Sequence, residues 1–467
     1  MDTNVNVESR TNGNESSSYS LTIFGNCLRC IRRLIPVDFK KEMIELSTLA
    51  GPVVMAQLMV FLVSFVSTVF CGHLGKTELA GVALAIAVIN VTGISIGSGL
   101  SSACDTLISQ TFGSRNLLKV GVILQRAILI QLLACFPCWA ILINTEPILL
   151  AVKQSPEVAT FIYQLEARYL QNQGIIWPQV ITGVVANLLN ALINYIFLYV
   201  LGLGVAGSAW ANTISQLSLA VMLYSYIIWK GLHKATWAGW SWECLEDWDT
   251  YVHLAIPSMI MLCAEWWTYE IGGFLAGLIS EVELGAQSVV YELANICYMF
   301  PLGFSVAGSV RVGNALGAGD TEQAKLSAKL AMFCAVSVCL SVLVGILKDK
   351  ISYVFTYDEQ IRERVAQVMA FYAPFLLLDA ASGSIIRGAG KQKVGAICNI
   401  LGYYGVGFPI GVSLMFAAKL GIMGLWTGLF TCVFLQSSFL IFYLSRMNWK
   451  KATVEVREQR HNTQVFI

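Results

Sequence analysis

Long apolar runs separated by short polar stretches dominate this chain and predict its architecture. A helix that crosses a membrane needs about 20 consecutive apolar residues. Runs close to that length recur along the sequence, at residues 45–70, 79–104, 118–143, 178–200, 205–229, 253–279, 285–308, 324–347, 365–386, 394–417 and 421–445. The pattern predicts an all-α, polytopic membrane protein.

A twelfth crossing is expected between Lys153 and Trp177, although this stretch is more polar and carries Glu157, Glu166 and Arg168. Lys and Arg gather in the cytoplasmic loops of membrane proteins. If the N-terminus is cytoplasmic, the basic residues of this chain gather inside only when residues 154–177 also cross. The sequence therefore favours about twelve helices with both termini in the cytoplasm, and leaves open whether this segment spans the membrane.

The chain also repeats itself. A shift of about 204 residues superposes GLSSACDTLISQTFG, which begins at Gly99, on GFSVAGSVRVGNALG, which begins at Gly303. A slightly larger shift places LGVAG at Leu203 on LGIMG at Leu420. Duplicated transporter bundles form two halves that rock about a midplane site. The repeat thus predicts two pseudo-symmetric six-helix lobes.

Polar stretches set the expected boundaries of the two lobes. They predict a polar N-terminal tail at 1–42, a first lobe at 43–229, a cytoplasmic linker at 230–251, a second lobe at 252–445 and a polar C-terminal tail at 446–467.

Composition excludes several functional classes. Hydrophobic residues make up 56% of the chain and charged residues only 13%, whereas soluble domains are about 25% charged. The net charge of +1 and the lack of a basic face interleaved with aromatic residues argue against nucleic acid. Neither a metal-ligand cluster nor a nucleophile with its base is apparent, so we expect no cofactor and no enzyme activity.

Carboxylates inside apolar stretches are the most informative residues. Glu265, Glu270 and Glu292 lie within segments long enough to cross a bilayer. Such residues are costly in lipid and usually mark a substrate or proton path. Asp105 also lies in an apolar stretch, but we expect it to be an interface residue rather than a ligand.

Aromatic residues accompany these carboxylates: Trp266, Tyr269, Tyr291 and Tyr298. On a helix, Glu265 shares a face with Tyr269, and Trp266 shares one with Glu270. Aromatic faces attract organic cations, and a carboxylate that binds either a proton or a cation can exchange one for the other. The residues therefore indicate a transporter of organic cations, whereas a lipid flippase would need a basic cavity.

Several motifs make the chain similar to a known family. EWWTYE at Glu265, VELGAQSVVYE at Val282, SVRVGNALGAGD at Ser309 and RGAGKQKVGAI at Arg387 resemble the vertebrate multidrug and toxin extrusion (MATE) transporters. The resemblance implies a secondary transporter at the plasma membrane that exports organic cations, including drugs and toxins, in exchange for protons by alternating access.

The resemblance also implies a set of site residues. It assigns transport roles to Glu265, Glu270, Glu292 and Asp379, and makes Gln57, Asn90 and Tyr269 candidate polar groups of the cavity. Cys71 and Cys135 become thiols near the path. The expected partners are organic cations, protons and the lipid bilayer.

Two alternatives remain open. Similar proteins have a longer apolar stretch between SPEV at Ser155 and YLQNQG at Tyr169. The chain is then a transport-defective, truncated variant with a regulatory role or no activity. The second alternative is an exporter coupled to sodium in place of protons.

Overall fold

The computed structural model describes residues 39–72, 86–143, 154–335, 338–350, 359–378 and 382–464. Within these ranges the secondary structure is helical throughout, without a β-strand. Residues 46–467 form one compact unit, and the contacts described below lie within it.

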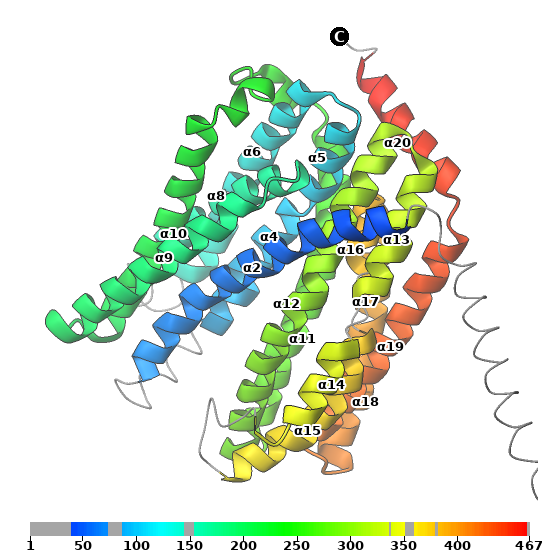
Figure 1. The fold of residues 1–467 in the computed structure, drawn as a ribbon. Coiled ribbons are helices and arrows are strands. Elements are labelled where there is room, and N and C mark those ends of the chain that lie inside the picture. Colours follow the sequence, from blue (N-terminus) through cyan, green and yellow to red (C-terminus); the bar gives the residue numbers. More distant parts are fainter. Residues whose placement is uncertain are drawn as a thin grey trace, which may run out of the picture. The chain divides into compact units, whose positions relative to one another are not determined.

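The helices fall into two groups that are consecutive in sequence (Figure 1). The first comprises α2 (Phe39–Gly72), η1 (Asn90–Ile94), α4 (Ser95–Ser101), α5 (Ala103–Gly113), α6 (Leu117–Ile143), α8 (Gln154–Asn172), α9 (Trp177–Tyr195), η2 (Ile196–Val200) and α10 (Gly204–Trp229). The second comprises α11 (Trp248–Gly277), α12 (Glu281–Ala318), α13 (Thr321–Ala335), α14 (Val338–Leu347), α15 (Glu359–Leu378), α16 (Ser382–Gly388), α17 (Gln392–Ile400), η6 (Leu401–Gly407), α18 (Phe408–Val412), η7 (Ser413–Ala417), α19 (Ile422–Arg446) and α20 (Trp449–Gln464). Between the groups lie two short 3-10 helices, η3 (Leu232–Ala235) and η4 (Trp242–Leu245).

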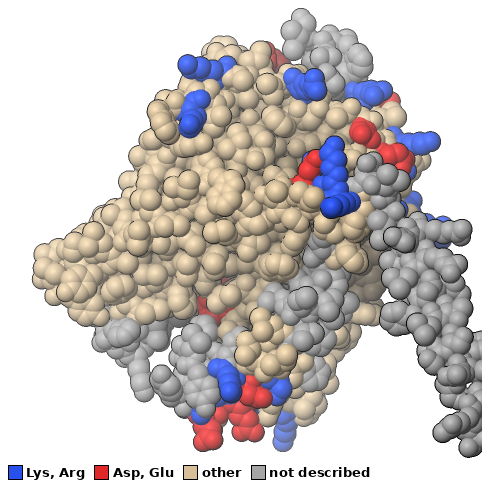
Figure 2. All heavy atoms as spheres, viewed as in Figure 1, with Lys and Arg blue, Asp and Glu red and all other residues tan. Residues whose placement is uncertain are grey.

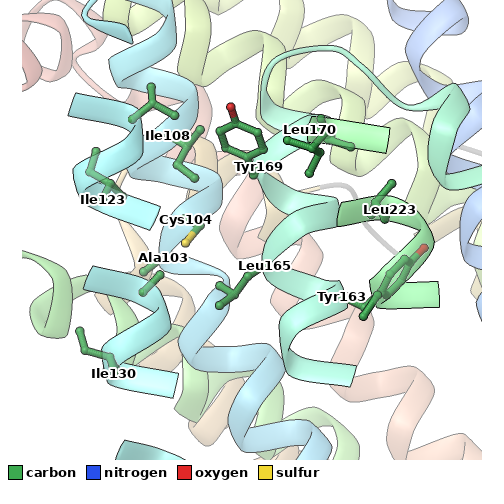
Figure 3. Packing of buried hydrophobic residues seen from close by; sticks show 14 of the residues in the cluster. Ala103, Cys104, Ile108, Ile123, Ile130, Tyr163, Leu165, Tyr169, Leu170 and Leu223 are labelled. Carbon is green, nitrogen blue, oxygen red and sulfur yellow. The ribbon is translucent and has the colours of Figure 1, made fainter. Parts of the chain in front are cut away.

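Each group has a hydrophobic core of its own. In the first, Ile108 of α5, Leu170 of α8 and Leu223 of α10 pack together fully buried (Figure 3). In the second, Val290 of α12 and Met369 of α15 belong to one buried cluster with residues of α19. Two separate cores agree with the prediction of two lobes.

Apolar side chains also cover the outside of the helices. On α9, Ile181, Leu188 and Leu192 are each more than half exposed, and they recur at helical spacing along one face. Figure 2 shows Lys and Arg mainly near two ends of the face in view, with a broad uncharged band between them. Eight described helices or helix runs are long and apolar enough to cross a membrane, so these exposed faces suit contact with lipid.

Glycines let the two groups approach closely, and they do so reciprocally. A Cβ at Gly99 of α4 would overlap α11 at Met259, and a Cβ at Gly303 of α12 would overlap α2 at Val54. Gly99 and Gly303 are equivalent in the sequence repeat. Each copy therefore places the same glycine against the first helix of the other copy, as a pseudo-two-fold axis requires.

The same reciprocity recurs where α5 meets α12. A Cβ at Gly113 would overlap the carbonyl oxygen of Asn314, and a Cβ at Gly317 would overlap the carbonyl oxygen of Gln110. Gly113 is equivalent to Gly317 in the repeat, and Gln110 is equivalent to Asn314. We call this contact between α5 and the C-terminal part of α12 the seam.

Backbone detail repeats as well. The π-helix η2 is followed by left-handed residues Gly202 and Gly204, and the π-helix η7 is followed by Lys419 and Gly421, also with positive φ. In each copy a further helix, α10 or α19, begins directly after this turn. The turns at Leu203 and Leu420, which the larger sequence shift superposes, are therefore equivalent in structure as well.

Gly421 offers a stability test with a matched control in the other copy. Both Gly421 and Gly204 have φ near +60°, but a Cβ at Gly421 would overlap the carboxylate of Glu283, whereas Gly204 has open space. Glu283 accepts hydrogen bonds from Arg364 Nε (2.6 Å) and from the backbone N–H of Ile422 (2.7 Å). We expect Gly204→Ala to cost about 1–2 kcal/mol from its backbone alone and Gly421→Ala to cost about 1–3 kcal/mol more.

The midpoint of thermal unfolding in detergent measures the difference between these two variants. Equal shifts for Gly204→Ala and Gly421→Ala would contradict the structural role given to the Glu283 carboxylate.

The polar residues of α8 face other helices. Gln164 accepts a hydrogen bond from Ser98 of α4 (3.2 Å), and Arg168 forms an ion pair with Asp105 of α5. The polarity of this segment is thus used in packing within the first group. Asp105 is an interface residue, as expected; that residues 154–177 cross the membrane stays a prediction.

The polar C-terminal tail contains a further helix. Residues from Trp449 to Gln464 form the helix α20, which packs against α12 and α13. Thr453 shares a hydrogen bond with Thr321 (2.8 Å), and Glu455 forms an ion pair with Lys391 (2.5 Å). An amphipathic helix can pack against other helices through one face while its other face stays polar. The average polarity of the segment does not reveal such a packing face.

Candidate functional site

The helix α11 carries two of the predicted carboxylates and lies between the two groups. It packs along η1 and α4 of the first group and along α12 and α17 of the second. The Glu270 side chain shares a hydrogen bond with Asn90, the first residue of η1. This bond joins two predicted site residues from opposite copies of the repeat.

A π-helical turn shapes the first group at this point. In a π-helix the backbone hydrogen bonds are shifted by one residue, and such turns are frequent at functional sites. The carbonyl oxygen of Val91 in η1 accepts hydrogen bonds from Trp267 Nε1 (3.1 Å) and from Ser95 Oγ (2.9 Å). Trp267 therefore connects α11 to η1.

Aromatic rings extend the site into the second group. The ring of Tyr269 lies 5.6 Å from that of Tyr291 and 6.1 Å from that of Trp426, measured between centroids. The indole of Trp426 donates a buried hydrogen bond to Gln287 Oε1 (2.8 Å). This bond fixes one ring of the cluster, and the planes of Tyr291 and Trp426 are tilted by 39° and 40° from that of Tyr269.

Glu292 follows Tyr291 on α12 and lies close to the other acids. It interacts electrostatically with Glu270, and Tyr291 shares a side-chain hydrogen bond with Asn295 one turn further on. The Oε2 atom of Glu292 is buried, and no residue in the described ranges hydrogen bonds to it. Two neighbouring carboxylates of like charge favour the binding of a proton or of a cation between them.

Glu265 lies one turn before Tyr269 on α11 and faces a positive charge. The guanidinium of Arg387, at the end of α16, interacts electrostatically with Glu265 and with Tyr298. Glu265 is half-buried. The site therefore contains two parts, an acidic pair at Glu270 and Glu292 and a mixed pair at Glu265 and Arg387.

Arg387 was not among the predicted site residues, although it begins the motif RGAGKQKVGAI. Its charge also acts on Asp105, the partner of Arg168. The backbone around it is held by α5, because Thr106 donates to the carbonyl oxygen of Arg387 and Gln110 donates to that of Gly388 (3.1 Å). A basic residue next to the apolar pair Ile385 and Ile386 was the available signal.

Other predicted residues have no described contact with this cluster. Trp266 on α11 and Gln57 on α2 are half-buried. Cys71 is buried and shares a hydrogen bond with Ser208 of α10, and Cys135 is buried on α6. Asp379 lies outside the described residues.

The chemistry of this arrangement is that of a cation site. Carboxylates supply negative charge, and tyrosine and tryptophan rings supply π faces. The amide of Asn90 hydrogen bonds to Glu270 and that of Asn295 to Tyr291, and these bonds orient the two side chains. An organic cation bound between the rings would be attracted to the ring faces by roughly 0.5–2 kcal/mol each. Protonation of the carboxylates would remove the charge that holds the cation.

Comparison with known proteins gives consistent matches. The MatE family model matches residues 52–196 and again residues 257–413, at an offset close to that of the internal repeat. Multidrug and toxin extrusion protein 1 of Danio rerio is 68% identical over 461 residues, which cover 94% of this chain and 78% of that protein. The protein of the same name from Homo sapiens is 57% identical over 445 residues, with coverages of 91% and 78%.

Solved structures agree with these sequence matches. The crystal structure of a eukaryotic MATE transporter has a TM-score of 0.85 and 27% sequence identity, and the match covers 90% of this chain and 99% of that chain. It confirms the predicted fold class, an all-helical, multi-pass membrane protein with two lobes of helices.

Proposed function

The chain belongs to the MatE family of multidrug and toxin extrusion transporters, and on that premise we propose that it exports organic cations in exchange for protons. One observation carries this proposal: the hydrogen bond between Glu270 and Asn90 brings an acidic residue of one repeat against a π-helix of the other. A ligand at this point would contact both halves, as alternating access requires.

Competition for the same negative charge supplies the coupling. In this mechanism the ionised Glu265, Glu270 and Glu292 hold the cation against Tyr269 and Tyr291 while the site is open to the cytoplasm. When the site opens to the outside, protons bind the carboxylates and the cation leaves. Arg387 stays charged throughout and lies beside Glu265, so it limits the number of positive charges that the site holds at once.

Orientation follows from the positive-inside rule. We propose that both termini and the segment between α10 and α11 are cytoplasmic and that the protein lies in the plasma membrane. To test this orientation, tags are placed at the C-terminus and after Gly239, and protease is added to sealed vesicles. Both tags should be cleaved together or protected together; cleavage of only one would contradict the orientation.

Transport by the purified, reconstituted chain tests the function. Proteoliposomes with an acidic interior should take up radiolabelled tetraethylammonium faster than vesicles without a pH gradient, and a protonophore should remove the difference. A sodium gradient of the same size is imposed in a parallel sample.

Two other outcomes would each replace the proposal with a stated alternative. Uptake driven only by sodium would establish sodium coupling. Absence of uptake by a well-folded, correctly inserted protein would indicate the transport-defective variant that the short segment between Ser155 and Tyr169 suggests.

A further inference from the structure

A cavity of about 320 Å³ lies where the seam meets α6, α11 and α20. Its walls include Gln110 of α5 and Gly317 of α12, which are the two residues of one reciprocal contact in the seam. It is separate from the cluster around Glu270, which shares none of its lining residues. Anything bound in this cavity would touch both sides of the seam.

Positive charge exceeds negative charge in the cavity lining. Lys119, Arg126 and Arg457 line it, against one acidic residue, Asp247. Glu246 also interacts with Arg126 electrostatically. The balance favours an anion with more than one negative charge.

Arg126 gives the second, independent indication of a ligand. Its side chain is only 5% exposed. One terminal nitrogen donates to the carbonyl oxygen of Glu243 (3.2 Å), but its Nε is buried and has no hydrogen-bond partner among the described residues. Arg126 lines the cavity, so a phosphate bound there would accept a charge-assisted hydrogen bond from its guanidinium.

The helix ends around the cavity strengthen this preference. The first turns of two long helices, α6 and α11, contribute Lys119 and Thr250 to the lining, and helix N-termini favour anions. The C-terminal end of α12 also lies there, and it would repel an anion. Arg457 offsets it, because its Nη2 lies within 2.9 Å of the position that a Cβ on Gly319 would occupy.

We infer that this cavity binds a phosphorylated ligand through Lys119, Arg126 and Arg457, and that the bound ligand holds the seam closed. The ligand chemistry is a phosphomonoester group, either on a soluble organic phosphate or on the headgroup of a phosphoinositide. By clamping α5 to α12, the ligand would slow the opening of the transporter on this side. The inference concerns a regulatory site, and binding is measured without any transport.

Binding to the purified full-length chain is the first measurement. Inositol 1,4,5-trisphosphate serves as the soluble probe, and nanodiscs with phosphatidylinositol 4,5-bisphosphate, compared with nanodiscs of phosphatidylcholine alone, serve as the lipid probe. Thermal unfolding reports stabilisation, and hydrogen exchange of residues 103–113 and 309–317 reports closure of the seam. We expect a higher unfolding midpoint and slower exchange in both segments.

Two double variants distinguish specific binding in the cavity from non-specific electrostatic attraction of the probe to the protein. The double variant Lys119→Gln with Arg457→Gln should weaken binding at least about tenfold, because hydrogen bonds to charged groups contribute about 1.5–3 kcal/mol each. The control is Lys329→Gln with Lys450→Gln, which removes the same charge at two exposed positions that do not line the cavity.

Each outcome has a defined meaning. Stabilisation by the soluble probe without stabilisation in phosphoinositide nanodiscs identifies a soluble phosphate ligand, and stabilisation in phosphoinositide nanodiscs identifies a lipid headgroup; both support the inference. Lack of stabilisation by either probe, equal binding by the two double variants, or binding without slower exchange at the seam would overturn it.

Discussion

Replacing Glu265 by Gln should abolish exchange of an organic cation for protons while leaving the protein folded and inserted. Glutamine keeps the size of the side chain but carries no charge, so it fixes this position in a state equivalent to the protonated one. The loss of one charge-assisted contact of about 1.5–3 kcal/mol predicts at least a tenfold loss of cation affinity. Arg387 would deepen the loss, since its charge near Glu265 would no longer be balanced.

The measurement for Glu265→Gln is tetraethylammonium binding and gradient-driven uptake, with insertion checked in parallel. The wild type should bind the cation less tightly as the pH falls, because protons compete for the carboxylates. The variant should bind weakly, and the part of the pH dependence that comes from Glu265 should disappear. Glu281→Gln, which removes an exposed carboxylate at the first turn of α12, is the control and should behave as the wild type. Uptake by Glu265→Gln at the wild-type rate would exclude this residue from the exchange site.

Substitution of Gly317 by Ala should open the seam between α5 and α12. The new Cβ would overlap the carbonyl oxygen of Gln110, and backbone on both sides leaves little room for adjustment. Overpacking of this kind costs about 1–3 kcal/mol. Because the contact is reciprocal, Gly113→Ala should have the same effect through Asn314.

Hydrogen exchange and uptake together distinguish an opened seam from general destabilisation. Exchange should accelerate in residues 103–113 and 309–317 in both variants, and uptake should fall by a similar factor. Gly273→Ala on α11 is the control, since a Cβ there has open space around it. If Gly317→Ala and Gly113→Ala gave unrelated exchange patterns, the seam would not be the symmetric contact described above.

The sequence predicted the repeat correctly because it depends on identical residues at equal spacing, whereas the roles of the carboxylates stay a prediction. Glu265 with Tyr269, and Glu270 with Trp266, follow from helical spacing alone, as does the presence of a carboxylate where lipid-facing residues would be apolar. The equivalence of Gly99 with Gly303 was visible as identical residues at equal spacing. Its consequence, close contact across the repeats, depends on an axis that only three-dimensional packing defines.

What escaped prediction depends on contacts between distant segments. The π-helix at Asn90 has no distinctive residue pattern, so its bond to Glu270 was not foreseeable. Arg387 was not predicted as a site residue, because the sequence does not show that Glu265 and Tyr298 lie near its charge. The polarity of residues 154–177 left their membrane crossing open, and the sequence did not reveal that Arg168 pairs with Asp105 of α5.

The exchanged contacts of the two glycines also bear on how the two copies can differ. Gly99 of the first copy packs against the first helix of the second copy, and Gly303 of the second copy packs against the first helix of the first copy. A chain containing one copy alone would leave both surfaces uncovered. In the present protein one chain supplies both copies, so each copy has a fixed neighbour and equivalent positions can differ, as Gly202 and Lys419 do.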